Sequence, residues 1–170
     1  MNALKSLVET QTLRDDAGNE EVVVFMYAAP DRKQSQFGNG ATLIQIGSEE
    51  YRLGSDCQWI KGQRTLVEKW PAFFFRSYGK VAGDARISGR ERTDAQETTV
   101  VAFTYIRYDF RLWIDSETYR VIQYTMEGPN HHMVSVYSDF DSAPPIEPPL
   151  MDATPTPSAA PPAAPVTTLP

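Results

Sequence analysis

Residues 98–140 read TTVVAFTYIRYDFRLWIDSETYRVIQYTMEGPNHHMVSVYSDF, and this stretch decides the fold. β-Branched and aromatic residues dominate it, as is typical of strands. Two turn-like groups, Asp115–Thr118 and Glu127–Asn130, interrupt it at hairpin spacing. We therefore predict a meander of three consecutive antiparallel strands. Long strands that are aromatic on one face build a large curved sheet, whose concave side must be filled.

Shorter alternating segments lie on either side of the chain's middle. Before residue 62 the sequence predicts five strands, over Leu7–Leu13, Glu21–Tyr27, Ala41–Gly47, Glu49–Leu53 and Cys57–Lys61, with a short polar segment at Lys33–Phe37. Turn residues such as Asp15–Asn19 and Gly38–Gly40 separate them. Ala85–Arg92 reads as one further, polar strand.

One segment, Gln63–Tyr78, favours a helix. Thr65 followed by Glu68 has the spacing of a capping box, and Pro71 would interrupt any long helix. The densest aromatic cluster of the chain, Ala72–Phe75, follows and would wedge between two layers. The predicted fold class is thus α+β, mainly antiparallel β, with a short helical plug.

The composition changes at the end of this predicted domain, which spans residues 1–142. Ten of the thirteen prolines lie after Ala143, separated mostly by Ala, Thr and Ser. Such a segment buries too little apolar surface to offset the entropy of ordering it. We expect residues 143–170 to form a flexible tail or linker.

Charge and composition exclude several classes of protein. The net charge of −6 and the absence of a basic run argue against a nucleic-acid partner. No apolar stretch is long enough to span a bilayer, and Met1–Gln11 lacks the features of a signal peptide. The single cysteine, Cys57, rules out an internal disulfide, and we expect it to be buried or half-buried beside Trp59.

The sequence offers little for catalysis or metal binding. His131 and His132 are the only histidines, and as neighbours on a strand they would point to opposite faces. Asp139 and Asp141 would share a strand face, but they flank the end of the domain, where turn-forming aspartates are common. We therefore predict a protein that is not an enzyme and needs no cofactor or metal.

The aromatic residues carry the functional prediction. Phe, Tyr and Trp make up 11% of the chain, and many occupy alternate positions of predicted strands. They either pack a core beneath Trp70–Phe75 or line an apolar cavity for a lipid-like ligand. Periodicity does not separate these two interpretations, because a cavity wall and a core wall carry the same residues.

Taken in order, several short pieces are similar to the LolA-like bacterial lipoprotein-carrier superfamily, with its LolA, LppX/LprG-type and RseB-like branches. They are Tyr27–Arg32 closing a strand, Ile44–Gly47 leading to Tyr51, Trp59, Leu112–Asp115 with Thr118, and Tyr137–Asp141 followed by Pro144–Pro149. The resemblance covers residues 4–149. It implies a strongly curved, incomplete β-barrel with a helical plug, outside the cytoplasm (periplasm or cell surface), whose concave interior holds acyl chains.

The resemblance and the aromatic pattern together predict a non-enzymatic domain that binds a lipid or the acyl moiety of a lipoprotein. The candidate cavity residues are Trp70, Phe73, Phe74, Phe75, Phe103, Tyr105, Leu112, Trp113, Ile122 and Tyr124. The alternative is an interaction or sensor module of a larger envelope protein, with a filled core and no lipid. We expect no nucleic-acid partner, and membrane association only through a segment absent from this chain.

Overall fold

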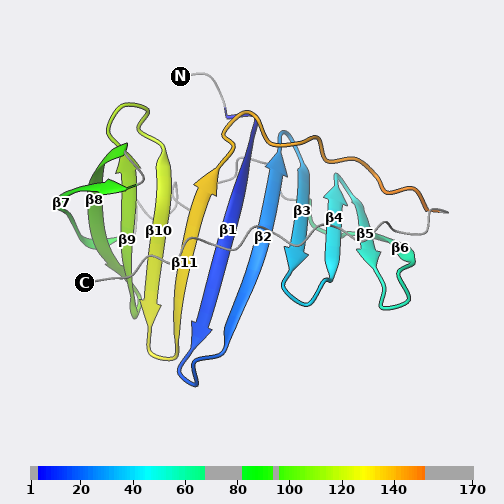
Figure 1. Cartoon of the computed structure of the whole chain (residues 1–170), viewed down its shortest axis with the longest axis horizontal. Coiled ribbons are helices and arrows are strands. Elements are labelled where there is room, and N and C mark those ends of the chain that lie inside the picture. The colour runs from blue at the N-terminus through cyan, green and yellow to red at the C-terminus, as the bar shows by residue number, and fades with distance from the viewer. Residues whose placement is uncertain (1–3, 68–81, 94–95, 152–170) are drawn as a thin grey trace.

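The strands of the protein form one antiparallel sheet, with no other layer of secondary structure in the residues that are described (Figure 1). The computed structural model describes residues 4–67, 82–93 and 96–151. The strands are β1 (Ser6–Asp15), β2 (Glu20–Ala28), β3 (Arg32–Phe37), β4 (Thr42–Ile46), β5 (Glu49–Leu53), β6 (Trp59–Gln63), β7 (Gly83–Thr93), β8 (Gln96–Tyr105), β9 (Tyr108–Asp115), β10 (Val121–Gly128) and β11 (His131–Ser138).

Sequential hairpins build the sheet from both ends of the chain, and they meet in its middle. The strand order is β6-β5-β4-β3-β2-β1-β11-β10-β9-β8-β7. Among the described strands, only the pairing of β1 with β11 joins strands far apart in sequence, and Glu9 lies opposite Tyr137 in that register. This single long-range pairing therefore unites the N-terminal and C-terminal halves.

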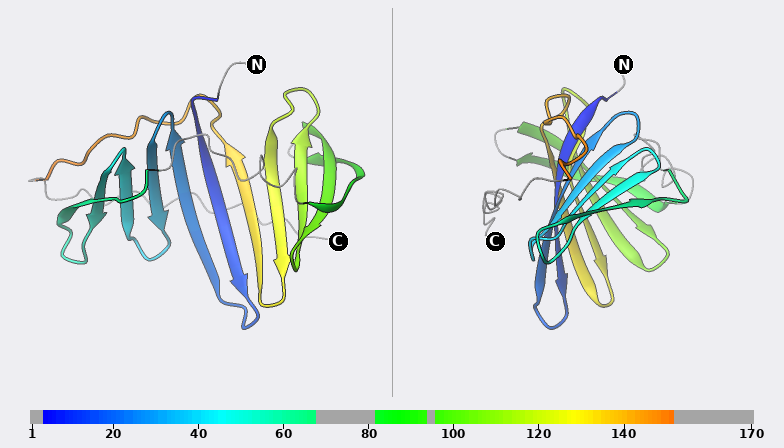
Figure 2. Two further views of the ribbon diagram at one scale, coloured as in Figure 1. Left: turned by 180° about the vertical axis from the view of Figure 1, so that it is seen from behind. Right: turned by 90° about the vertical axis from the view of Figure 1, so that its right-hand side faces the viewer.

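The predicted antiparallel β class is confirmed, and the sheet is open. In Figure 2 the strands fan out with a twist, and the sheet is neither closed nor as strongly curled as the predicted half-barrel. None of the described residues forms a helix. Gln63 ends β6, residues 64–67 are not helical, and the rest of the predicted helical segment lies outside the described residues. The polar segment at Lys33–Phe37 proves to belong to a strand, β3.

Cross-strand register assigns each side chain to one of two faces, since opposed residues in a ladder point the same way. Glu9, Tyr137, Phe103 and Phe110 share one face, which we call the aromatic face. The opposite side, which we call the strap face, carries Ile44. Its name refers to the chain after Ala143, which lies along that side.

Residues 143–150, which we call the strap, run along the sheet and are anchored on it by Ile146, although their composition predicts a flexible tail. Ile146 is 1% exposed and sits in a cluster with Ile44 and Tyr51. Arg32 donates a hydrogen bond from Nη1 to the carbonyl of Ile146 at 2.5 Å. The packed part of the chain therefore reaches Ile146 at least. Residues 152–170 of the predicted tail lie outside the described residues.

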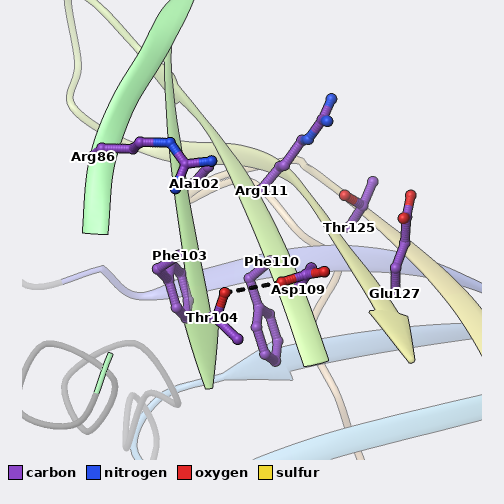
Figure 3. Close-up of a pocket in the computed structure, with 9 residues that line it drawn as sticks. All are labelled: Arg86, Ala102, Phe103, Thr104, Asp109, Phe110, Arg111, Thr125 and Glu127. Carbon is purple, nitrogen blue, oxygen red and sulfur yellow. Dashed lines mark hydrogen bonds between the residues drawn. The ribbon is translucent and has the colours of Figure 1, made fainter. Parts of the chain in front are cut away.

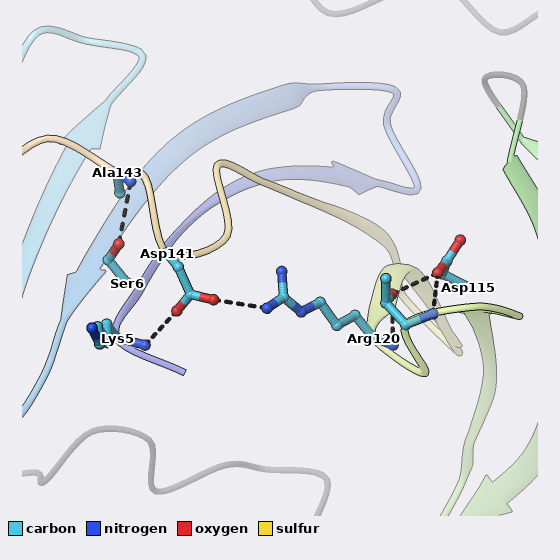
Figure 4. Close-up of polar contacts among 7 residues, drawn as sticks. Lys5, Ser6, Asp115, Arg120, Asp141 and Ala143 are labelled. Carbon is cyan, nitrogen blue, oxygen red and sulfur yellow. Dashed lines mark hydrogen bonds and ion pairs between the residues drawn. The ribbon is translucent and has the colours of Figure 1, made fainter. Parts of the chain in front are cut away.

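The strap begins where three parts of the chain meet around Asp141 (Figure 4). One carboxylate oxygen of Asp141 accepts a bond from the Lys5 backbone N–H, and the other pairs with Arg120, both at 2.7 Å. The Ala143 backbone N–H donates to the Ser6 hydroxyl at 3.2 Å. These contacts direct the chain from the end of β11 across the start of β1.

The meander contains four strands, not the predicted three. Residues 98–115 do not form one long strand, because Ile106 and Arg107 make a two-residue turn between β8 and β9. The turn has no Gly or Asn to mark it in the sequence, and Ile106 adopts a φ of 60°. A β-branched residue in this region is strained. The hairpin is thus held by its strands rather than by its turn chemistry.

We expect Ile106→Gly to raise the free energy of unfolding by about 1 kcal/mol. Glycine tolerates positive φ, and its greater freedom in the unfolded chain offsets only part of the relieved strain. Ile106 is 77% exposed, so little packing is lost. Urea denaturation checks this, with Arg107→Gly as the control because the φ of Arg107 is not positive. An equal gain in both variants would contradict the explanation.

Candidate functional site

An apolar cluster occupies the aromatic face over β8–β10. Its buried members are Phe103, Phe110 and Leu112. The rings of Phe103 and Phe110, opposed in the β8–β9 register, stack at a centroid distance of 4.9 Å and an angle of 3°. The residues packed around them are Ala82, Val101, Tyr105, Tyr108, Ile114, Val121, Tyr124 and Met126. The alternation of the meander places these side chains on one side.

A polar cluster adjoins it over the central strands. Tyr124 stacks on Tyr137 at 6.2 Å, which connects the apolar cluster to β11. Tyr137 lies opposite Glu9, whose side chain is buried with 7% of the residue exposed. Glu9 accepts hydrogen bonds from the hydroxyls of Tyr27 at 3.1 Å and Tyr137 at 3.5 Å. We call Glu9, Tyr27, Tyr137 and the fully buried Ser135 the Glu9 cluster.

Burial governs the electrostatics of this cluster. It raises the pKa of the Glu9 carboxyl above its usual value, while hydrogen bonds from Ser135 and Tyr27 and the charge of Lys33 act in the opposite direction. Burial, and then the nearby carboxylate of Glu9, raise the pKa of the Tyr137 phenol. The Lys33 ammonium lies 4.6 Å from the centre of the Phe25 ring. The cluster therefore combines a buried acid with neutral donors and one adjacent cation.

The pKa of Glu9 predicts a specific pH dependence of stability. Because that pKa is higher in the folded than in the unfolded protein, the folded state binds more protons between the two values. We expect the wild type to gain stability relative to Glu9→Gln as the pH falls from about 7 toward the ordinary Glu value of 4.5. Urea unfolding of both proteins across this range measures the difference.

Glu50→Gln is the matched control, because the contribution of Glu50 to stability should change with pH in the opposite direction. The hydrogen bond from Gln45 lowers the pKa of Glu50 in the folded protein. Glu50 thus contributes stability above the unfolded value of 4.5 that is lost as the pH falls through its folded pKa. A wild-type gain over Glu9→Gln that grew with rising pH would contradict the assignment for Glu9.

The structure brings together some of the predicted cavity residues. Phe103, Tyr105, Leu112 and Tyr124 share the aromatic face. Trp113 lies on the strap face, where its indole N–H donates to the Glu91 carboxylate at 2.8 Å. The remaining candidates are Ile122, at a register irregularity between β9 and β10, and Trp70, Phe73, Phe74 and Phe75, which lie outside the described residues.

Sequence reasoning missed the Glu9 cluster. The alternation of Leu7, Glu9, Gln11 and Leu13 is visible in the sequence and puts these residues on one face of β1. The available signal was a carboxylate in the same alternating set as the apolar residues Leu7 and Leu13. What makes it a cluster, the contacts from β2 and β11, depends on pairing that no local pattern reveals.

Other groups considered for chemistry take up ordinary positions. His131 and His132 begin β11 on opposite faces, as predicted. Asp139 and Asp141 do not share a strand face, because both follow β11 with positive φ. Cys57 is exposed in a turn, contrary to the expected burial. Among the described residues, no group of three or more His, Cys, Asp or Glu side chains could hold a metal ion.

A shallow pocket of about 200 Å³ lies on the strap face over β7–β10, far from the strands that the strap covers (Figure 3). Its rim carries two arginines and two acids, namely Arg86, Arg111, Asp109 and Glu127. The Thr104 hydroxyl donates to the Asp109 carboxylate at 2.9 Å. Phe103 and Phe110 also line this pocket, but the mixture of exposed opposite charges on its rim is unsuited to an apolar ligand.

The sheet has clear counterparts among solved structures. LprF from Mycobacterium bovis matches with a TM-score of 0.61 and 10% identity over 86% of this chain and 90% of LprF. The lipoprotein LppX of Mycobacterium tuberculosis matches with a TM-score of 0.54 and 9% identity over 85% and 90% of the two chains. This chain has the fold of LprF and LppX. The predicted resemblance to the LolA-like superfamily, through its LppX/LprG-type branch, is confirmed as a likeness of fold.

Other comparisons add less. A LolA superfamily protein from Nitrosomonas europaea matches with a TM-score of 0.35 and 10% identity over 84% of this chain and 87% of that protein. Neither a scan of protein-family models nor a search of curated proteins finds a match to the sequence. Within the described part of the LppX-like fold, no helix is long and apolar enough to cross a membrane.

Proposed function

We propose that this LppX-like domain binds a lipid, or the acyl moiety of a lipoprotein, on its aromatic face outside the cytoplasm. The observation that carries the proposal is the contiguous apolar cluster on one face of an open sheet. The fold shared with LppX and LprF supports it. Phe103, Phe110 and Leu112 are already buried, so the half-buried members of the cluster, such as Tyr105 and Tyr124, supply the surface that contacts the ligand.

Binding of this kind needs no covalent chemistry. Moving an acyl chain from water to an apolar surface stabilises the complex by roughly 0.8 kcal/mol for each buried CH₂ group. A long chain is therefore held by shape and burial alone. The function proposed is accordingly that of a carrier or receptor for an amphiphile, not that of an enzyme.

Native mass spectrometry of the purified protein, followed by lipid extraction, tests this function. We expect a mass above that of the polypeptide and an extractable lipid that accounts for it. Stripped protein should then bind a fluorescent fatty acid or a fluorescent acylglycerol. A clean polypeptide mass together with no binding of either probe would overturn the proposal.

Tyr105→Glu should abolish binding of the fluorescent lipids while leaving the protein folded. Tyr105 is half-buried at the edge of the apolar cluster, so a charge there would have to be desolvated by any acyl chain that covers it. Val136→Glu is the matched control, because Val136 is 43% exposed and lies on the strap face. Circular dichroism checks the fold. Equal loss of binding in both variants would argue against a site on the aromatic face.

The alternative function, an interaction or sensor module, has one observation in its favour. The edge strand β7 is long and mostly exposed, and Ile87 within it is 72% exposed. An edge strand presents unpaired backbone groups that can pair with another chain. In this case a protein partner would be retained by the wild type and lost on Ile87→Asp, and the lipid tests above would be negative.

A further inference from the structure

The Glu9 cluster is a buried polar feature of the aromatic face next to the apolar cluster, and the proposed lipid function leaves it unused. Glu9 is 7% exposed and bonded to the hydroxyls of Tyr27 and Tyr137. A buried carboxylate costs free energy unless its hydrogen-bonding capacity is met. Its position beside a proposed acyl site suggests a role in recognising the polar end of the ligand.

The spacing of the strands fits this role. From β8 to β1 the sheet order passes through β9, β10 and β11. Four strand spacings amount to ~19 Å, a distance that an extended acyl chain can cover. The apolar cluster and the Glu9 cluster touch where Tyr124 of the first stacks on Tyr137 of the second. An amphiphile lying across the strands with its chain over β8–β10 would therefore place its head at Glu9.

The chemistry of the cluster decides which head would be accepted. An ionised carboxylate has roughly four lone-pair sites, and the hydroxyls of Tyr27, Tyr137 and Ser135 occupy part of that capacity. A hydroxyl or amide N–H group of a ligand can donate to the lone-pair site that is left. A ligand carboxylate would instead bring a second negative charge into a buried setting, which is unfavourable.

Lys33 does not reverse this preference. Its ammonium lies over the rings of Phe25 and Tyr27, at 4.6 and 5.4 Å from their centres, and its charge acts on Glu9. One cation and one acid together leave the cluster close to neutral. Such a setting suits a neutral head better than an anionic one.

Resting on the proposed lipid function, we propose that Glu9 is a headgroup site that selects neutral amphiphiles with hydroxyl or amide donors over free fatty acids. The ligand class is thus an acylglycerol or an amide-linked acyl group, not a fatty-acid anion. In this role Glu9 accepts hydrogen bonds from the head while the apolar cluster holds the chain. The selection is made by the polar end, since the chains can be identical.

Two lipids with the same chain test the proposal, namely monododecanoylglycerol and dodecanoate. Isothermal titration calorimetry at about pH 8, where a free fatty acid is ionised, measures both affinities below the micelle concentrations. We expect the wild type to bind the glyceride about tenfold more tightly or better, since juxtaposed like charges are strongly disfavoured. Glu9→Gln should bind dodecanoate more tightly and so shrink this ratio toward one.

Glu50→Gln is the matched control for this experiment. Glu50 points to the same side of the sheet as the aromatic face but lies in β5, bonded to Gln45 and Arg52. The same substitution there should leave the wild-type ratio intact. Circular dichroism and the unfolding midpoint verify that both variants are folded.

The outcomes separate this inference from the function on which it rests. If the wild type binds neither lipid, both are overturned. If it binds the two lipids equally, lipid binding stands and the headgroup site is overturned, and this result needs no variant to fold. If the wild type prefers the glyceride but Glu9→Gln keeps the full preference, the role of Glu9 is overturned.

Discussion

Ile146→Ala will lower the free energy of unfolding by about 2–5 kcal/mol, as removal of a fully buried aliphatic side chain does. Ile146 is 1% exposed and packs on Ile44 and Tyr51, with Met26, Ala28, Ile46 and Trp59 around them. Alanine would leave a cavity between the strap and the strands beneath it. A loss of this size would make residues 143–150 part of the folded domain.

Leu150→Ala is the control for this prediction. Leu150 lies in the same strap but is 78% exposed, and such surface changes stay within about 0.5 kcal/mol. Urea unfolding followed by tryptophan fluorescence measures both variants. Equal midpoints for Ile146→Ala and the wild type would mean that the strap does not contribute to stability in solution.

Phe110→Ala has the other large expected effect, a loss of about 3–5 kcal/mol. The Phe110 residue is 3% exposed, and its ring stacks on Phe103 at 4.9 Å. The substitution removes the stacked pair and opens a void beneath the half-buried residues proposed to contact the ligand. We therefore expect weaker binding of the fluorescent acylglycerol as well, measured under conditions where the variant is still folded.

Ile87→Ala provides the comparison for Phe110. By register Ile87 belongs to the same aromatic face, yet it is 72% exposed on the edge strand β7. Its truncation should change stability by less than about 0.5 kcal/mol. Should Phe110→Ala cost as little as Ile87→Ala, the stacked pair would not be a stabilising part of the core.

Much of the fold could be predicted from the sequence. The alternation of Leu7–Leu13 identifies β1, the apolar run within Glu21–Tyr27 identifies β2, and Glu127–Asn130 marks the hairpin before β11. Strand formation follows from a two-residue period and from the residues that fill it, and both are local properties. The antiparallel class follows from the short connections between these strands.

Two sequence predictions that proved wrong, for the turn at Ile106 and for the burial of Cys57, also have local causes. The turn at Ile106 and Arg107 carries no residue that favours positive φ, so the sequence predicts an uninterrupted strand there. Cys57 is exposed because it lies in the turn between β5 and β6, whereas its apolar character suggested burial. In both positions the flanking strands impose a conformation that the residue itself does not favour.

The candidate site was predicted only in part. Alternation correctly groups Phe103, Tyr105, Leu112 and Tyr124 on one face. Phe103 and Tyr105 are two residues apart in β8, and Leu112 lies opposite Tyr124 in the pairing of β9 with β10. Apolar character alone wrongly included Trp113, which lies on the other face as the immediate neighbour of Leu112. Adjacent apolar residues in a strand belong to opposite faces, and apolar character alone does not reveal this.

What the sequence by itself determined is the set of antiparallel strands and the apolar character of the meander, since both depend on residues close together in the chain. The tertiary structure decided which strands meet and what the aromatic face contains. The bond between Tyr137 and Glu9 joins residues 128 positions apart, and Ile146 docks beside Arg32 across 114 positions. Burial of Glu9 and docking of the strap exist only after β1 pairs with β11, because neither segment carries a local signal for its distant partner.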